Sequence, residues 1–510
     1  MLAPVNMPGR TILPLLVLFA CGDDGGPDRA IPPDASGTEV PAVVPECVEV
    51  PQPSADPFKA PTDLGPIVPG TLAGWDPDGR WFLTGVRVGG ISSYHFARQG
   101  EGVIVDGDTD APGTLDNDVL FQRGTIQTDF GDYTVVKRVS NRAADGTLRA
   151  ERVLCDGSSC VKCTAKLERA THNASEGESD HLSLVGELND PTWPKVYTLN
   201  VRVAGTLAYL VRRDGLHIIE TADPAHPVQV GFYGRPQPSG RANDIKIVEA
   251  GAKRYALIGD VPVDIVDVTN PAAPTLAGQI AEEAHTLAVE SRNGKTYAYF
   301  GNYNARCTAY DVTDPTHPAK LGSFSTPGYM VHDLSIENGI AYLNAWDAGF
   351  YAVDFTTPTA PVLVGRWANT PTGTSHSSWP MHVGNRHIAL HGEEDYGAHL
   401  DVVDIDPTSA TFMKSIGSYK TRDVVSIHNI MAFGTKAYFT YYQDGVRVMD
   451  LANPEAPALV GYFNTWDPQA PTATNQFFEG AVGIDVDVAR KLVFVADSPR
   501  GLIILKDETP

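Results

Sequence analysis

The chain has 510 residues, with 62 acidic and 39 basic side chains and a formal net charge of −23. Hydrophobic residues make up 42% of it and charged residues 20%, which is typical of folded globular proteins and excludes wholesale disorder and a multi-span membrane topology. The acidic excess repels phosphate backbones and no Lys/Arg-rich stretch offsets it, so we expect no nucleic-acid partner.

The N-terminus has the pattern of an exported protein. Arg10 precedes an apolar run over residues 11–20, which is too short to span a bilayer but fits the apolar region of a signal peptide. The last residues of the run and the cysteine after it, Leu18 to Cys21, resemble the lipobox of bacterial lipoproteins. In such proteins the cysteine is lipidated and becomes the new N-terminus. The resemblance implies a signal peptide over 1–20 and a lipid on Cys21. An ordinary signal peptide followed by an incidental cysteine is the alternative.

Lipidation would anchor the protein to a bacterial membrane, facing the periplasm or the cell surface. Residues 21–73 are rich in Pro, Gly, Asp and Ser and are predicted to form an extended tether between that anchor and the folded part.

Five cysteines remain after Cys21, and export places them in a compartment that favours disulfides. We expect Cys307 to be a buried free thiol and the other four to form two disulfides, with all three pairings open: Cys47, Cys155, Cys160 and Cys163. The spacing of the last three also matches the start of a plant-type ferredoxin motif, and a zinc site with His172 as fourth ligand is a further alternative.

A small antiparallel β domain is predicted over residues 74–172. Alternating, β-branched or aromatic runs separated by turn signals predict its strands: 81–88, 94–97, 103–105, 133–139, 148–154 and 161–167. Gly79-x-Trp81 faintly resembles the opening of lipocalin-like barrels, and no ligand is inferred from it. Residues 173–180 are predicted to be a linker.

The rest of the chain, residues 181–507, repeats one unit seven times. The complete units contain four short strands within 40 to 50 residues, which is the pattern of a β-propeller blade. The third strand ends in Asp and runs into a turn with two prolines, as in DVTNPAAP from Asp267 and DVTDPTHP from Asp311. The fifth unit departs from this pattern, with DIDPTSAT from Asp404.

These units resemble LVIVD repeats, through the third-strand sequences DIVDV from Asp264 and DVVDI from Asp401. The resemblance implies a β-propeller on an exported bacterial protein, and it adds no catalytic residues. The predicted fold is therefore all-β: a small antiparallel β domain followed along the chain by a seven-bladed propeller of four-stranded blades.

The seventh unit has only three strands of its own. Residues 183–188 (SLVGEL) match the fourth strands of the other units, such as ALVGYF. We therefore predict that this N-terminal strand completes the last blade and closes the ring, which leaves no long unpaired edge.

Histidines and carboxylates are predicted to gather at one mouth of the central channel, because first strands start and second strands end on the same face. The candidate binding residues are Asp244, Asp260, His285, His332, His376, Glu393, His428 and Glu479. In the functional interpretation they bind a divalent metal ion or a polar ligand. In the structural interpretation each imidazole bonds the neighbouring blade, which the repetition favours. The fifth unit is the most irregular, so a site should lean toward it.

No nucleophile elbow, phosphate-binding loop or H-E-x-x-H motif occurs, so we assign no catalytic residue and no cofactor apart from that divalent ion. The leading hypothesis is a lipid-anchored envelope propeller that binds or scaffolds a protein or polysaccharide partner. The alternative is a metal-dependent enzyme that uses the histidine-rich mouth.

Overall fold

This computed structural model describes residues 40, 43–51, 57–84, 92–100, 102–105, 111–128, 131–173, 176–235, 242–470 and 478–510. The predicted signal peptide, Cys21 and much of the predicted tether lie outside these ranges. The chain divides into two compact units, Met1–Arg169 and Ala170–Pro510. In the described part of the chain, no helix has the length and apolar character needed to cross a membrane.

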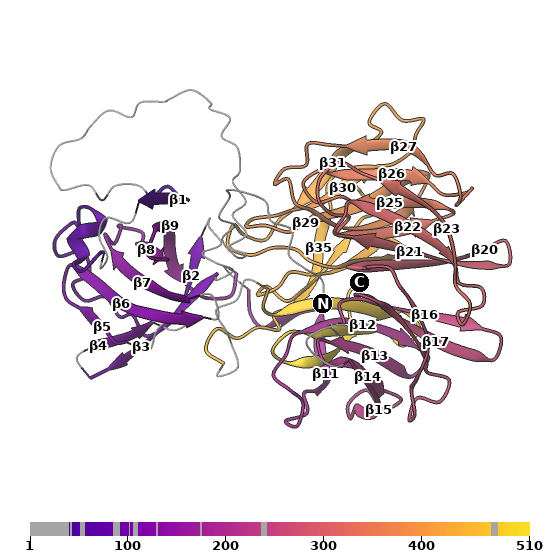
Figure 1. Cartoon of the computed structure of the whole chain (residues 1–510), viewed down its shortest axis with the longest axis horizontal. Coiled ribbons are helices and arrows are strands. Elements are labelled where there is room, and N and C mark those ends of the chain that lie inside the picture. The colour runs from indigo at the N-terminus through magenta and orange to yellow at the C-terminus, as the bar shows by residue number, and fades with distance from the viewer. Residues whose placement is uncertain are drawn as a thin grey trace, which may run out of the picture. The chain divides into compact units, whose positions relative to one another are not determined.

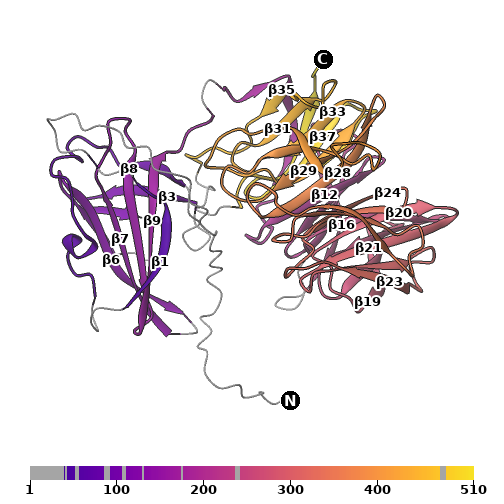
Figure 2. The same cartoon turned by 90° about the horizontal axis from the view of Figure 1, so that it is seen from above.

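The first unit is an antiparallel β-barrel with one added strand (Figure 2). Its strands are β1 (Glu46–Pro51), β2 (Gly79–Thr84), β3 (Ser93–Gln99), β4 (Gly102–Val105), β5 (Gly113–Leu115), β6 (Val119–Thr128), β7 (Gly131–Ser140), β8 (Leu148–Cys155) and β9 (Ser159–Arg169), with one short 3₁₀ helix at Pro61–Leu64. Strands β2 to β9 pair in chain order, and β9 also pairs with β2, which closes the barrel. The predicted small antiparallel domain is confirmed, and its closure is an addition that the strand pattern did not show.

Both disulfides lie in this unit and involve the four expected cysteines. Cys47 of β1 is bonded to Cys163 of β9, and Cys155 at the end of β8 is bonded to Cys160. This pairing leaves none of the four as a thiolate ligand, so the iron–sulfur and zinc alternatives are wrong. Cys307 is a buried free thiol, as predicted. Disulfides are typical of exported proteins.

The second unit is a seven-bladed β-propeller (Figure 1). Blade 1 comprises β12 (Thr198–Ala204), β13 (Leu207–Arg212), β14 (Gly215–Glu220) and β15 (Val228–Gly234). Blade 2 comprises β16 (Ile245–Ala250), β17 (Lys253–Ile258), β18 (Val263–Asp267) and β19 (Thr275–Ile280). Blade 3 comprises β20 (Thr286–Arg292), β21 (Lys295–Asn302), β22 (Arg306–Asp311) and β23 (Ala319–Ser325). Blade 4 comprises β24 (Asp333–Glu337), β25 (Ile340–Asn344), β26 (Phe350–Asp354) and β27 (Val362–Trp367).

Blade 5 comprises β28 (Ser375–Val383), β29 (Arg386–Glu393), β30 (Leu400–Asp404) and β31 (Lys414–Tyr419). Blade 6 comprises β32 (Ile430–Phe433), β33 (Lys436–Thr440), β34 (Val446–Asp450) and β35 (Ala458–Phe463), and blade 7 comprises β36 (Ala481–Asp487), β37 (Leu492–Asp497) and β38 (Gly501–Asp507). The first strands of successive blades contact one another in order, and β36 contacts β12, so the ring closes.

The seventh blade is completed as predicted. Strand β11 (Leu182–Leu188) pairs antiparallel with β38, and its Leu182 is buried. In Figure 1 the yellow strands of the last blade accordingly lie beside the magenta strands of the first.

The residues before β11 also belong to the propeller. Strand β10 (Ser179–Asp180) adds a fifth strand to blade 6 beside β35. Glu176 forms an ion pair with the fully buried Arg447 at 2.7 Å. The described part of the predicted linker is therefore fastened to the blade.

The glycine that recurs in the fourth strands has a packing reason. A Cβ at Gly231 would lie 1.9 Å from the carbonyl oxygen of Pro271, in the proline turn of the next blade, and one at Gly186 would lie 2.1 Å from that of Pro224. No side chain fits at such distances, so the glycine and the proline turn form one contact between adjacent blades. The second of these contacts joins blade 7 to blade 1.

Candidate binding site in the propeller channel

Strand pairing identifies one equivalent position per blade at the channel mouth. In four blades the backbone NH of this residue donates to the end of the second strand, as from His332 to the oxygen of Asn344 at 2.8 Å. In blades 1, 5 and 7 the pairing between the first and second strands skips one residue at this point, and the skipped residue occupies the equivalent position. The seven equivalent residues are Leu199, Asn243, His285, His332, His376, His428 and Val482.

All seven line one cavity with a volume of about 840 Å³. Four consecutive blades, 3 to 6, supply histidine at this position, whereas the other three supply leucine, asparagine and valine. Half of the mouth is therefore an arc of imidazoles, which we call the histidine arc: His285, His332, His376 and His428.

The rings of the histidine arc contact one another in sequence. The Nε2 atoms of His285 and His332 are 3.1 Å apart. The ring centroids of His332 and His376 are 4.2 Å apart, and those of His376 and His428 are 4.4 Å apart. Burial lowers the pKa of His285 and that of His428 to about 4, so both imidazoles are neutral at neutral pH.

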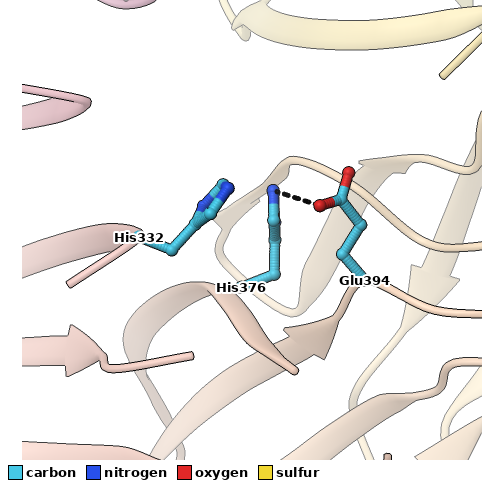
Figure 3. A group of neighbouring side chains, drawn as sticks. All are labelled: His332, His376 and Glu394. Atoms are coloured by element: carbon cyan, nitrogen blue, oxygen red, sulfur yellow. Dashed lines mark ion pairs between the residues drawn. The ribbon is translucent and has the colours of Figure 1, made fainter. Parts of the chain in front are cut away.

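Glu394, which follows β29, joins the histidine arc. Its Oε2 lies 3.8 Å from Nε2 of His376, and its Oε1 lies 3.9 Å from Nε2 of His428. The hydroxyl of Tyr442 donates a hydrogen bond to the same carboxylate. Figure 3 shows His332, His376 and Glu394 projecting into the same space, with His376 between the other two.

Aromatic side chains border the histidine arc. Trp346 stacks on His332 with a centroid distance of 4.9 Å, and Tyr442 contacts His428 at 4.9 Å. The Tyr303 hydroxyl lies 2.8 Å from Nδ1 of His285. Trp346 and Tyr442 occupy equivalent places two residues after their second strands, and both have positive φ.

The links between blades come mostly from the residue that follows the mouth position. Thr286 donates to the backbone oxygen of His332 at 2.8 Å, and Ser377 donates to that of His428 at 2.5 Å. In blade 1 the corresponding Asn200 donates to Asp244 at 2.6 Å. Among the imidazoles, His428 also makes such a link, from Nδ1 to the oxygen of Val482 at 2.8 Å. The structural task proposed for the histidines is therefore performed largely by their neighbours.

The predicted carboxylates are placed differently from the histidines. Asp260, Glu393 and Glu479 are not among the side chains that line the cavity. The carboxylate of Glu393 instead accepts the backbone NH groups of Thr372 and Thr374, at 2.8 and 3.2 Å, and so holds the loop before β28. The alignment of Glu479 with the histidines fails because Val482 occupies that position in blade 7.

Asp244 lines the cavity, but it lies one position after the mouth residue Asn243. Burial raises the pKa of its carboxyl group, but the ammonium of Lys246, at 2.6 Å, and the guanidinium of Arg202 outweigh this and lower the pKa. Burial, together with the charge of Asp244, raises the pKa of Asp333 to about 6. Asp244 accepts hydrogen bonds from Asn200 of blade 1 and from the backbone NH of Leu287 of blade 3, so this carboxylate links three blades.

The other polar residues of the fifth unit are dispersed. His391 is buried, and its Nε2 lies 2.8 Å from Oγ of Ser375. His382 and His387 stack at 4.2 Å beside Glu337, whose Oε2 is 2.7 Å from Nε2 of His387. Only His376 and Glu394 from this unit belong to the histidine arc and its carboxylate.

Sequence reasoning did not place Glu394, Trp346 or Tyr442 at the mouth. Glu394 could have been found, because it directly follows Glu393, the last residue of a second strand whose end faces the channel. The aromatic residues carried a weaker signal, since their shared place after the second strand becomes clear only from the turn geometry.

The architecture and the cavity together define a β-propeller with a ligand-sized site at one channel mouth. Residues 197–234, 239–281 and 328–369 match the LVIVD repeat, a repeat of propeller-forming proteins. The chain therefore carries LVIVD repeats, as its third-strand sequences indicated.

Two solved structures match this chain at low sequence identity. The structure of U3-55K matches with 8% identity and a TM-score of 0.48, over 66% of this chain and 99% of that chain. The WD40 β-propeller domain of Doa1 matches with 11% identity and a TM-score of 0.47, over 64% of this chain and 97% of that chain. A search among curated proteins gave no match.

Proposed function

We propose that the chain is a binding module of the bacterial cell envelope that takes part of a protein or polysaccharide partner into the histidine-lined channel mouth. The observation that carries this proposal is the cavity of about 840 Å³, walled on one half by four neighbouring imidazoles. Cavities of this volume are within the range that small ligands occupy.

The chemistry of the mouth suits a partly polar ligand. The neutral imidazoles of His285 and His428 can donate and accept hydrogen bonds, and the bordering Trp346 and Tyr442 offer ring faces. The residues after the mouth position make several of the links between blades, so these links do not depend on the imidazoles alone.

Binding can be tested with the labelled full chain on oligosaccharide and peptide arrays. The parent should bind a defined subset of spots, and the double variant His332→Ala/His376→Ala should lose them. The matched control is His226→Ala/His317→Ala, which removes two exposed imidazoles of the proline turns and should bind like the parent. An array pattern unchanged in His332→Ala/His376→Ala would refute the mouth as the binding site.

We further propose that a lipid on Cys21 holds this module at the membrane. The lipobox resemblance of Leu18 to Cys21 supports the anchor, and the disulfides support export. Replacing Cys21 with Ser should move the protein from the membrane fraction to the soluble fraction. A variant that still requires detergent for extraction would contradict the anchor while leaving the binding proposal intact.

A further inference from the structure

We propose that His332, His376 and Glu394 bind a divalent transition-metal ion of the zinc class, with one coordination position open to the channel cavity. This inference rests on the proposed binding function, because it names an ion for the same cavity. Each of the three side chains offers one ligand atom, and these atoms all lie within 4.8 Å of one another.

The distance between the ligand atoms of His376 and Glu394 is close to that between metal ligands. Two ligands at about 2.0–2.1 Å on a tetrahedral zinc ion are about 3.3 Å apart. The 3.8 Å between Nε2 of His376 and Oε2 of Glu394 exceeds a hydrogen bond, and it is about half an ångström wider than that ideal. Side-chain rotation would have to bring these two atoms about half an ångström closer, and the ligand atom of His332, which lies within 4.8 Å of both, closer as well.

Surrounding groups hold the three side chains in place. Tyr442 donates to the carboxylate of Glu394, and Trp346 stacks on His332. His376 and Glu394 are only 2% and 4% exposed, which restricts their rotamers. Such outer contacts orient the ligands of metal sites and tune their affinity.

A further imidazole borders the open position. Nδ1 of His428 must carry a hydrogen, because it donates to the carbonyl oxygen of Val482 at 2.8 Å. For the neutral ring, Nε2 then carries the lone pair, and this atom lies 3.9 Å from Glu394. His428 can therefore bond a water or ligand group on the ion, or complete its coordination.

The donor set defines the class of ion. Two imidazoles and one carboxylate bind zinc in sites that keep a fourth position open, and they suit other first-row divalent ions better than calcium or magnesium, which prefer oxygen ligands. A second cluster, Glu337, His382 and His387, has the same donor set, but His382 is exposed and the other two are half-buried. The buried triad is the better organised of the two, and the second cluster provides a matched control.

The test uses the purified full chain, stripped with a chelator and then titrated with Zn²⁺ in a calorimeter and with Co²⁺ in an absorption spectrometer. We expect tight uptake of about one zinc ion per chain, and a visible cobalt band typical of four-coordination. His332→Ala/His376→Ala should abolish both signals, whereas His382→Ala/His387→Ala should retain them. Circular dichroism melts of each variant establish that it is folded.

Two conservative variants keep the test decisive even if the double alanine variant unfolds. Glu394→Gln preserves shape and should weaken zinc binding at least tenfold. Tyr442→Phe removes only the hydroxyl that orients Glu394 and should weaken binding by about tenfold. The proposal is overturned if the parent takes up no zinc, or if uptake is lost in His382→Ala/His387→Ala instead. Array binding that persists in the stripped parent without zinc uptake would overturn the metal site alone and leave the proposed function standing.

Discussion

The buried imidazole of His391 should make the propeller sensitive to acid, and the size of this effect can be worked out. Burial lowers its pKa to about 3, against about 6.5 in an unfolded chain. The unfolded state therefore takes up a proton as the pH falls below 6.5, and the folded state does not. The stability that the neutral ring contributes is complete above pH 6.5 and is lost progressively between pH 6.5 and pH 3.

At pH 5 the unfolded imidazole is 1.5 pH units below its pKa, which corresponds to about 2 kcal/mol of lost unfolding free energy at 1.36 kcal/mol per unit. The comparison is with His391→Gln, which keeps a polar side chain near Ser375 but does not titrate. Other histidines of the propeller, such as His285, titrate in both proteins and cancel in the difference.

Urea unfolding followed by tryptophan fluorescence at pH 7.5 and pH 5 measures this difference. Trp367 lies 5.5 Å from His391 between ring centroids and reports on this region of the propeller. We expect the stability advantage of the parent over the variant to fall by about 2 kcal/mol between the two pH values. An advantage that is the same at both would refute the reasoning that burial keeps His391 neutral.

Three further predictions concern the construction of the fold. Removing the chain through Leu188 should expose β38 and cause aggregation, whereas removing only the first unit should leave a stable propeller; equal solubility of the two truncations would contradict closure by β11. Glu176→Gln should lower the unfolding free energy of the propeller by about 2–3 kcal/mol, because it leaves the buried guanidinium of Arg447 without its charged partner, and an unchanged urea midpoint would show that this contact contributes nothing. In the first unit, Cys47→Ala should cost about 5 kcal/mol and Cys155→Ala about 2 kcal/mol, because their disulfides close loops of 116 and 5 residues; calorimetric melts with the reverse order would refute the chain-entropy argument.

The repeat made most of the propeller predictable. Each blade is a local unit of four strands, so the same alternation and the same proline turn recur at a fixed spacing. The match of residues 183–188 to the other fourth strands was enough to predict closure. The recurrent glycine of that strand was visible too, although its reason, contact with the proline turn of the next blade, required the structure.

The channel mouth was only partly predictable. The histidines share a position that the repeat reveals, and the structure brings all four together. Asp244 and Glu479 were assigned to that position from similarity alone, and strand pairing gives it to Asn243 and Val482 instead. Glu479 lies three positions before Val482, and Asp244 one position after Asn243, so alignment by similarity misplaced the start of the first strand in both blades.

The sequence by itself determined the local units, because strand alternation, turn residues and cysteine number depend on neighbours along the chain. The tertiary structure alone decided which cysteines pair, whether β9 meets β2 to close the barrel, and which carboxylate joins the histidine arc. Glu393 and Glu394 show why: they are adjacent in sequence, but successive residues at the end of a strand point to opposite sides. Glu393 therefore holds a loop and Glu394 faces the channel. Which of the two sides lines the channel depends on how the blades pack around it.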